Sequence, residues 1–490
     1  MRQNNDSNRL TVIESQSQKK KRPPQKKTVV RAKQNPDVAL HQAMTLANKR
    51  EPTIQERAEK HRIENEHKYK QETHGQSVNN QRPKKKEPNQ RTAAPKKSSS
   101  KSKKSAIKSK LFHKDKDIQD GPDFFIVYVV TILVVIGLVM VFSASSYRSL
   151  IEYGTAYSYF LRQFVYAIIG LGVMAVVAVI SPDIFNKIAP IALFGVLLLV
   201  IYTIFNGEES LGATRWVTIG GIRFTPSEFA KPLMVICTAD LIKNDPYDIF
   251  RGKNNIAVFA MMIVAVIAIA SEDLGSAIAI VGGCFFIFCI AGITKRDVVI
   301  VMIAGILCVV AACIQEPYRI HRILGFLSQT EADAASGSAY QLVQSLYAFG
   351  SGGLFGVGIG NSGQKLLYLP GMHTDFIFSV IGEELGIIGA LLVVALFMIF
   401  MWRGFWIAAH IEDTYKSYLA FGCTAIISVQ ALINMGVAVG LLPVTGITLP
   451  FISYGGTSLV MSLLIVGILL NMSRYADKGG KKKRVRRTKK

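Results

Sequence analysis

The chain has 490 residues, a formal net charge of +23 and 50% hydrophobic residues, a combination that a single soluble domain rarely shows. The charge is concentrated at the ends. Residues 1–120 contain 31 Lys and Arg against 13 Asp and Glu, residues 474–490 contain 10 against 1, and residues 121–473 contain 16 against 20. This composition excludes a secreted disulfide scaffold, a soluble enzyme and a conventional nucleic-acid-binding domain.

Residues 1–120 are rich in Lys, Arg, Gln, Ser, Asn and Pro and are predicted to be a disordered basic tail, with one charged helix over residues 52–71. Basic runs such as Lys84–Lys86 lie near a membrane segment, where they favour anionic lipid over nucleic acid. No apolar stretch precedes Phe124, so we expect the first membrane helix to direct insertion. Residues 474–490 form a second basic tail.

Residues 121–473 are predicted to be an all-α polytopic membrane domain, because a bilayer core about 30 Å thick needs about 20 apolar residues per helix. Ten apolar spans are expected, at residues 124–142, 164–180, 188–204, 229–242, 256–270, 276–291, 298–313, 376–400, 418–441 and 457–470. An even number places both termini on one side, and the basic tails place that side in the cytoplasm.

The longest connection, residues 315–374, is an outer loop between helices seven and eight. Its sequence at 340–349, YQLVQSLYAF, predicts a short helix lying in the membrane interface. The glycine-rich residues that follow lack the G-K-[ST] ending of a phosphate-binding loop, which favours a tight bend whose backbone N–H groups face a ligand.

Ionisable residues within or beside the spans are costly and are candidates for function. Glu228 and Lys231 are spaced to pair on one helix face, with Ser227 as a cap before them. They form either a structural pair or a site where Lys231 meets an anionic substrate group. Arg215, beside Trp216, adds a guanidinium at the outer interface.

Two further groups of acids lie at the outer side. Glu272 and Asp273 interrupt the turn between helices five and six, either as a solvated hairpin or as part of a site. Asp375, Glu383 and Glu384 follow His373 near the start of helix eight, and at least one of the two glutamates is expected to face a polar cavity. Outer basic residues, carboxylates and glycine-rich loops suit a substrate with a lipid tail and an anionic head, whereas a transporter would place charges near the midplane.

The chain resembles the SEDS family (shape, elongation, division and sporulation) of FtsW, RodA and SpoVE. The matching strings are GATRW at 212–216, PSEFAK at 226–231, EDLG at 272–275, AYQLVQSLYAFGSGGLFGVGIGNSGQK at 339–365, LPGMHTDFIFSVIGEELG at 369–386 and GLLPVTGITLPFISYGGTS at 440–458. They follow the order and spacing of the family, and residues 446–451 are more similar to the division and sporulation members.

The resemblance implies an inverting peptidoglycan glycosyltransferase that polymerises lipid II and releases undecaprenyl pyrophosphate. The essential aspartate of the family corresponds here to Asp333, with Glu331 as the alternative. The chain departs from the family pattern at this point, because SQTEAD at 328–333 lacks the prolines and the tryptophan of N-P-W-x-D-P.

The resemblance also implies a clamp for the pyrophosphate, for which the candidates are Lys231, Arg215 and Lys365, with a divalent cation, Mg²⁺, at the diphosphate. Further family positions belong to the predicted substrate site, with roles that are either catalytic or structural: Glu228, Asp273, Gln364, His373, Asp375, Glu383 and Ser453.

The implied partners are lipid II, undecaprenyl-linked glycan, a class B penicillin-binding transpeptidase and other division proteins, in the bacterial cytoplasmic membrane at the septum. Membrane lipids would bind the basic tails, and no nucleic-acid partner is expected. Two other functions remain open: a lipid II flippase or scramblase, and a division scaffold without catalysis. A flippase needs a polar groove for the lipid-linked head group but no catalytic base.

Overall fold

The computed structural model of the protein describes residues 121–210, 213–219, 222–243, 253–292, 337–366 and 368–477, with nine single positions between Val299 and Phe326. Three parts of the chain lie outside the described residues: the expected tail over residues 1–120, most of the expected span at 298–313, and residues 478–490. So do the candidate catalytic residues Glu331 and Asp333.

Seven described helices are long and apolar enough to cross a membrane, which confirms a polytopic membrane protein. They are α4 (Phe124–Tyr153), α5 (Ser158–Val177), α6 (Pro182–Asn206), α8 (Lys253–Glu272), α14 (Gly386–Ala409), α15 (Thr414–Ala438) and α16 (Gly456–Ser473). Two helices of 17 residues, α7 (Pro226–Ile242) and α9 (Leu274–Ile290), correspond to two more expected spans. The total of ten stays a prediction.

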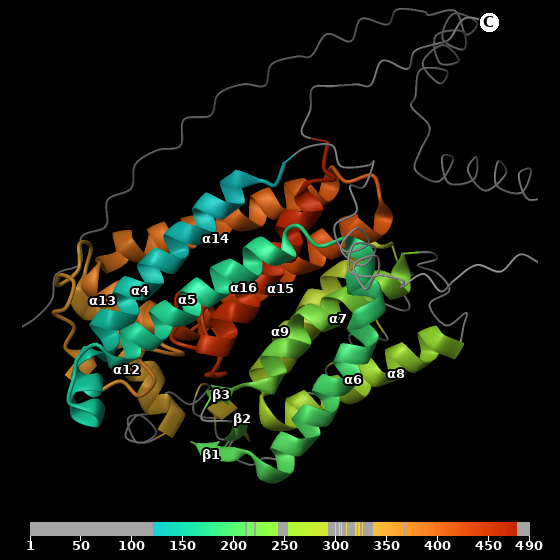
Figure 1. The fold of residues 1–490 in the computed structure, drawn as a ribbon. Helices are drawn as coiled ribbons and strands as arrows, with labels where there is room; N and C mark the ends of the chain where they lie inside the picture. The colour runs from blue at the N-terminus through green and yellow to red at the C-terminus, as the bar shows by residue number, and fades with distance from the viewer. Residues whose placement is uncertain are drawn as a thin grey trace, which may run out of the picture. The chain divides into compact units, whose positions relative to one another are not determined.

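The described helices from α4 to α9 run in alternating directions, as do α14, α15 and α16, and together they define two ends of the bundle (Figure 1). We call the end where α4, α6, α8 and α15 finish the loop end, and the opposite one the terminal end. At the terminal end, Arg403 of α14 donates to Asp123 at 2.7 Å, and the Asp123 backbone N–H donates to Ser473 Oγ at 2.9 Å. The start of α4 is thereby joined to α14 and to the end of α16.

The predicted helical fold is confirmed, and at the loop end a small antiparallel sheet that was not predicted connects α6 and α7. Its strands are β1 (Glu208–Ser210), β2 (Ala213–Ile219) and β3 (Ile222–Phe224), in the order β1-β2-β3. The sequence ATRWVTI is rich in β-branched and aromatic residues, and Gly220-Gly221 after it is a hairpin signal that the helical interpretation overlooked.

The eighth expected helix, over residues 376–400, is two helices instead of one. α13 (Ile377–Glu384) ends before Gly386, which has a φ of 70° and starts α14. A Cβ at Gly386 would collide with the Leu354 carbonyl oxygen and the Gly356 nitrogen, so the break accommodates the glycine-rich loop. The helix expected over 340–349 is confirmed as α12 (Gly337–Gly352).

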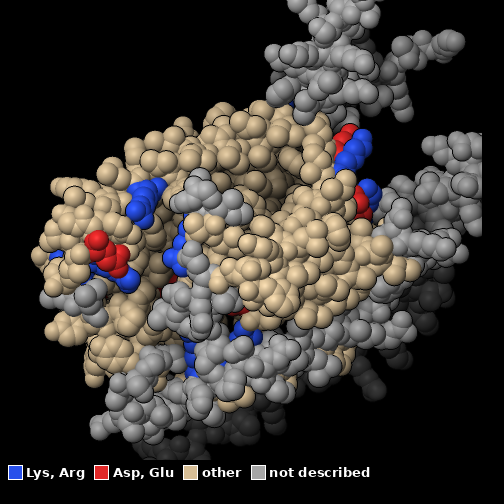
Figure 2. Space-filling view, turned by 60° about the horizontal axis from the view of Figure 1, so that its bottom comes forward, with Lys and Arg blue, Asp and Glu red and all other residues tan. Residues whose placement is uncertain are grey.

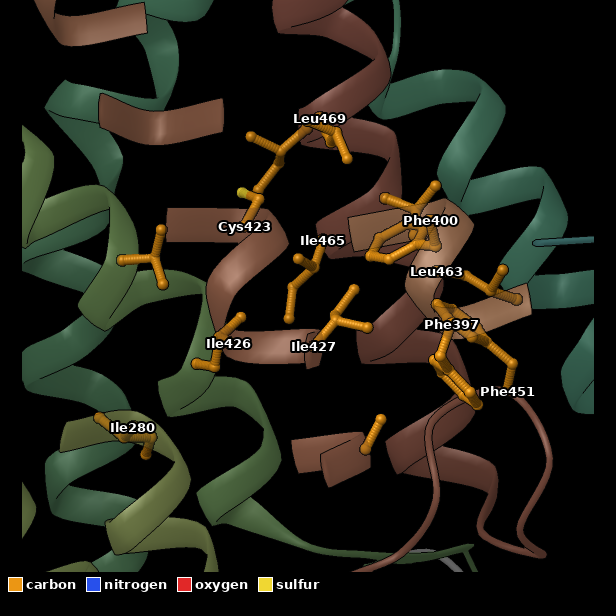
Figure 3. Packing of buried hydrophobic residues seen from close by; sticks show 14 of the residues in the cluster. Ile280, Phe397, Phe400, Cys423, Ile426, Ile427, Phe451, Leu463, Ile465 and Leu469 are labelled. Atoms are coloured by element: carbon orange, nitrogen blue, oxygen red, sulfur yellow. The ribbon is translucent and has the colours of Figure 1, made fainter. Parts of the chain in front are cut away.

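The packed core lies around α15 and α16, whose apolar windows are 78% buried against 28% for α5, α6, α8 and α14. Figure 3 shows Ile426 and Ile427 of α15 facing the side chains of neighbouring helices, with Phe397 of α14 against Phe451. Phe451 belongs to the non-helical segment 440–455 and has a φ of 67°, a strained conformation for this residue that the surrounding packing holds. The core therefore supports a non-helical segment at the loop end.

Helix α5 is tied to the last span by polar contacts. Gln163 Nε2 donates to the Ser453 carbonyl at 3.0 Å, and Gln163 Oε1 accepts from the Gly455 N–H at 3.2 Å. Near the other end of α5, Asn471 Nδ2 donates to the Val177 carbonyl at 2.8 Å. These buried amides fix the second described span against the last one.

Candidate functional site

The start of α9 brings Asp273 and Arg215 together at the loop end. Asp273 caps the helix by accepting from the Ser276 N–H at 3.2 Å and from Ser276 Oγ at 2.7 Å. Arg215 Nη2, on β2, lies 3.7 Å from Asp273 Oδ1, while its Nη1 donates to the Gly446 carbonyl at 3.2 Å. The guanidinium thus joins the sheet, the α8–α9 turn and segment 440–455.

A cavity of about 140 Å³ opens beside this contact and is lined by three arginines, Arg215, Arg319 and Arg322. Its other walls come from the start of α9 and from segment 440–455: Leu274, Gly275, Ile278, Ile323, Pro443, Val444 and Thr445. In Figure 2, Lys and Arg side chains lie near the middle of the face that carries the loop end. Most of the cavity surface is apolar and its charged lining residues are the three arginines, which suits a ligand with an anionic group next to an apolar part.

Arg319 is fixed in this position by backbone contacts. It is 5% exposed and donates to the Ala270 carbonyl at 2.8 Å and the Ser271 carbonyl at 2.6 Å, at the end of α8. On the opposite wall, Thr445 Oγ1 is buried without a hydrogen-bond partner among the described residues. Because a buried hydroxyl normally finds a partner, this one is available to a ligand in the cavity.

The two aspartates near Arg215 have opposite pKa shifts. Burial opposes ionisation of Asp273, but Arg215 and Ser276 outweigh it and hold its pKa below the ordinary value. Burial raises the pKa of Asp375, with Asp273 adding to the shift and Arg215 and Arg322 opposing it. Asp273 is therefore the ionised partner of Arg215, and Asp375 is the carboxyl more readily protonated.

Glu228 and Lys231 form the pair expected from their spacing. Lys231 Nζ lies 2.7 Å from Glu228 Oε1 and 2.9 Å from Gln430 Oε1 on α15, and the lysine is 1% exposed. The expected cap is wrong: Thr225 is the residue before the helix, and Ser227 Oγ lies inside α7, buried and without a partner among the described residues.

Two amides of α15, Gln430 and Asn434, are part of the site and were missed in the sequence analysis. Gln430 Nε2 donates to the Thr448 carbonyl at 3.0 Å, and Asn434 Nδ2 donates to the carbonyls of Asp375 and Ile447, both at 2.7 Å. Their i, i+4 spacing in an apolar span was the available signal, since polar residues there need a partner inside the protein.

Ser453 and His373 hold the turn 371–376, which carries Asp375. Ser453 Oγ donates to the Thr374 carbonyl at 2.6 Å, and the His373 carbonyl accepts from the Tyr454 N–H at 2.8 Å. The His373 ring packs against Tyr159 and Tyr454, with Nδ1 buried and unpartnered among the described residues. Burial lowers the pKa of His373 to about 4, so its ring is neutral at pH 7.

Glu383 and Glu384 bind the glycine-rich segment that precedes them. Glu383 accepts from Ser362 Oγ and, at 2.9 Å, from the Gly363 N–H. Glu384 accepts from Ser143 Oγ of α4 at 2.6 and 2.8 Å. Both carboxylates are thus engaged by the protein itself.

The remaining clamp candidate and its neighbour also lie in the glycine-rich segment. Lys365 Nζ contacts the Gly360 carbonyl. Gln364 starts a short 3₁₀ turn, and its Oε1 is buried without a partner among the described residues. The structure therefore brings Arg215, Asp273 and Asp375 together near the cavity, and places Gln364, Lys365 and Glu383 in a second cluster.

A family described as cell cycle protein, comprising FtsW, RodA and SpoVE, matches residues 123–478 of the chain. Stage V sporulation protein E of Bacillus subtilis is 38% identical over 363 residues, covering 73% of this chain and 98% of that one. A probable peptidoglycan glycosyltransferase FtsW of Geobacter metallireducens is 36% identical over 355 residues, covering 72% and 94%. The chain belongs to the FtsW/RodA/SpoVE family.

Solved structures agree with this assignment. A peptidoglycan synthase complex that coordinates polymerization and crosslinking contains a chain that is similar with a TM-score of 0.59 and 26% identity, covering 73% of this chain and 99% of that one. The rod shape determining protein RodA of Thermus thermophilus matches with a TM-score of 0.53 and 25% identity, covering 72% and 97%.

Proposed function

We propose that this protein is an inverting peptidoglycan glycosyltransferase that polymerises lipid II into glycan strands during cell division. The observation that carries the proposal is the cavity lined by Arg215, Arg319 and Arg322. The leaving group of the reaction is undecaprenyl pyrophosphate, and guanidiniums bind phosphate oxygens with two parallel donors. The names of the FtsW relatives support the reaction.

The arginines bind the pyrophosphate and stabilise the charge that grows on it as the glycosidic bond breaks. Asp333, with Glu331 as the alternative, removes the proton from the sugar 4-hydroxyl of the acceptor. Both acids lie outside the described residues, in the stretch between Arg322 and α12. Attack from the face opposite the leaving group inverts the anomeric carbon.

Lys231 and Lys365 contribute to the site indirectly in this proposal. Lys231 Nζ contacts Glu228 and Gln430, Lys365 Nζ contacts the Gly360 carbonyl, and neither lysine lines the cavity. We assign Lys231 to the positioning of α15, whose amides hold the backbone of segment 440–455.

Mg²⁺ remains a proposal in a limited form. Among the described residues, no group of three His, Cys, Asp or Glu side chains is placed to hold a metal ion. Asp273, the ionised acid nearest the cavity, is paired with Arg215. The described side chains therefore do not form a complete Mg²⁺ site by themselves, and no step of the reaction is assigned to the ion.

We further propose that the loop end faces the outside of the cytoplasmic membrane, with both basic tails in the cytoplasm, where they bind anionic lipid. Polymerised glycan must be crosslinked, so a class B penicillin-binding transpeptidase is the proposed partner, and other division proteins join it at the septum. The similarity to a chain of a complex that couples polymerization to crosslinking supports such a partner.

The test is polymerisation of purified lipid II by the full chain reconstituted with its transpeptidase. Wild type should make polymer, Asp333→Asn should make none, and Arg322→Gln should reduce the rate about 100-fold, the loss expected for one charge-stabilising group. Lys243→Gln removes a basic charge from the end of α7, where it pairs with Asp240 at the terminal end, and should leave the rate unchanged.

Different results would change the assignment. Normal polymerisation by Asp333→Asn would transfer the role of base to Glu331. If wild type makes no polymer beside a competent partner, while both it and Asp333→Asn move lipid II across vesicles, the protein is a flippase. Equal losses in Arg322→Gln and Lys243→Gln would refute the arginine clamp.

A further inference from the structure

The glycine-rich segment carries an apolar surface that the proposed reaction does not use. Residues 350–364 contain no charged side chain. Within this segment Leu354 is 61% exposed, Phe355 81% and Ile359 59%. We call residues 353–359 the apolar tip. A row of large exposed apolar side chains on a loop is unusual on a surface that faces water.

The apolar tip is held in place by backbone hydrogen bonds to the junction between α13 and α14. Val357 N–H donates to the Glu383 carbonyl at 2.9 Å and Gly358 N–H to the Glu384 carbonyl at 3.0 Å. In the other direction, Ile387 N–H donates to the Gly353 carbonyl at 2.9 Å. A Cβ at Gly356 would collide with the Glu384 carbonyl oxygen, so glycine permits this close approach.

The same contacts place the apolar tip beside the lipid-facing surface of α14. Ile388 N–H donates to the Leu354 carbonyl at 3.3 Å, and Ile388 is 53% exposed. One turn further along α14, Leu391 is 60% exposed. The exposed apolar surface of the membrane span therefore continues without interruption onto the tip.

The length of α14 sets the depth of this surface. Its 24 residues extend about 36 Å at 1.5 Å per residue, slightly more than a hydrocarbon core of about 30 Å. Trp402, Arg403 and Trp406 lie toward its far end and are typical of the opposite membrane interface. The start of α14 and the tip bound to it consequently lie at the membrane boundary of the loop end.

The polar residues of the glycine-rich segment face the protein and not the lipid-facing surface of α14. Ser362 and Gly363 donate to Glu383, and Lys365 contacts the Gly360 carbonyl, so these three residues bind other groups of the protein. The glycine-rich segment is therefore amphipathic. Its apolar tip is exposed, and residues 360–365 lie against the protein.

We propose that the apolar tip inserts into the bilayer leaflet at the loop end, where Leu354, Phe355 and Ile359 contact phospholipid acyl chains. The occupant is lipid, because the tip has no charge, lies at the depth of the membrane boundary and continues the lipid-facing surface of α14. Insertion fixes the glycine-rich segment against the membrane. The proposal goes beyond glycosyl transfer and holds whether or not the chain polymerises lipid II.

Photo-crosslinking tests this contact directly. p-Benzoylphenylalanine replaces Phe355 in the full chain, which is reconstituted in vesicles of phosphatidylethanolamine and phosphatidylglycerol, irradiated and analysed by mass spectrometry for lipid adducts. Leu391 on α14 is the positive control, and Glu412, exposed after the end of α14, is the control outside the spans. We expect the adduct yield at Phe355 to be within about twofold of Leu391 and at least about fivefold above Glu412.

Two substitutions at Phe355 test whether the apolar tip inserts into the bilayer or only lies near it. With the probe at Leu354, Phe355→Asp should lower the lipid adduct about fivefold because a charge opposes insertion, whereas Phe355→Leu should retain it. Phe355 is exposed, so neither change removes core packing. A Phe355 yield equal to that of Glu412 would overturn the proposal. So would adducts to the transpeptidase instead of lipid in the reconstituted complex.

Discussion

Two clusters of charged residues at the loop end differ in what their side chains bind. In the cavity cluster, Arg215, Arg319 and Arg322 line an open cavity with Asp273 beside them. In the glycine-loop cluster, Glu383 and Lys365 are bound by serine, backbone N–H and carbonyl groups of the same chain. The sequence analysis predicted Arg215 and Asp273 of the first cluster, and Lys365 and Glu383 of the second, as part of the substrate site.

The difference shows that a charged residue near a membrane boundary can stabilise the fold or bind a ligand, and that an adjoining cavity distinguishes the two roles. A carboxylate that accepts from a hydroxyl and a backbone N–H stabilises a loop, and its removal costs folding free energy. Arg215 and Arg319 also bind groups of the chain, but they border a cavity, and there the Thr445 hydroxyl has no hydrogen-bond partner among the described residues. Substitutions in the two clusters should therefore separate stability from activity.

The largest loss of stability is expected from Lys231→Met. Lys231 is a buried charge whose ammonium is paired with a carboxylate of the same chain. The substitution leaves the Glu228 carboxylate buried without its ammonium partner, which costs about 3–5 kcal/mol. Denaturant unfolding of the detergent-solubilised protein measures the change. The double variant Glu228→Gln with Lys231→Met should recover much of the loss, and a single variant as stable as wild type would show that the pair contributes nothing.

His373 should give the next largest effect, as a pH dependence. Because its pKa falls from 6.5 to about 4 on folding, the unfolded chain binds more protons between these values. The free energy of unfolding is fully retained above pH 6.5 and falls by up to about 3 kcal/mol as the pH drops to about 4. His373→Gln should flatten this slope in unfolding measurements, and an unchanged slope would contradict a buried neutral imidazole.

A smaller loss is expected from Glu383→Gln in the glycine-loop cluster. The amide keeps the shape of the carboxylate but weakens the bonds from Ser362 and Gly363, which costs about 1–3 kcal/mol. Glu412→Gln is the matched control, since this glutamate is exposed after the end of α14, where a substitution should change the free energy of unfolding by less than about 0.5 kcal/mol. Equal melting temperatures for both variants would show that Glu383 does not stabilise the fold.

The smallest effect on stability is expected from Thr445→Val in the wall of the cavity. Since Thr445 Oγ1 has no partner among the described residues, its removal should change the free energy of unfolding by less than about 0.5 kcal/mol. The same variant should raise the KM for lipid II if the hydroxyl contacts the ligand. A large stability loss with an unchanged KM would assign Thr445 to the fold.

Local spacing was enough to predict some of these features. The Glu228–Lys231 pair follows from its i, i+3 positions, and α12 from the apolar stripe at 342–347. The contact between Arg215 and Gly446 joins residues 231 positions apart, so no local pattern could reveal it. The hydrogen bonds to Glu383 likewise depend on the helix break at Gly386. The continuous apolar pattern over residues 376–400 predicted one helix and gave no sign of this break.

The contact between α5 and α16 constrains how the protein is made. Gln163 enters the membrane with the second described span, but its partners, the Ser453 carbonyl and the Gly455 N–H, are about 290 residues later. At roughly 5–20 residues per second, the ribosome supplies them some 15–60 s afterwards. Until then the buried amide lacks its final partners, so nascent chains that stop before α16 should be preferred targets of membrane proteases.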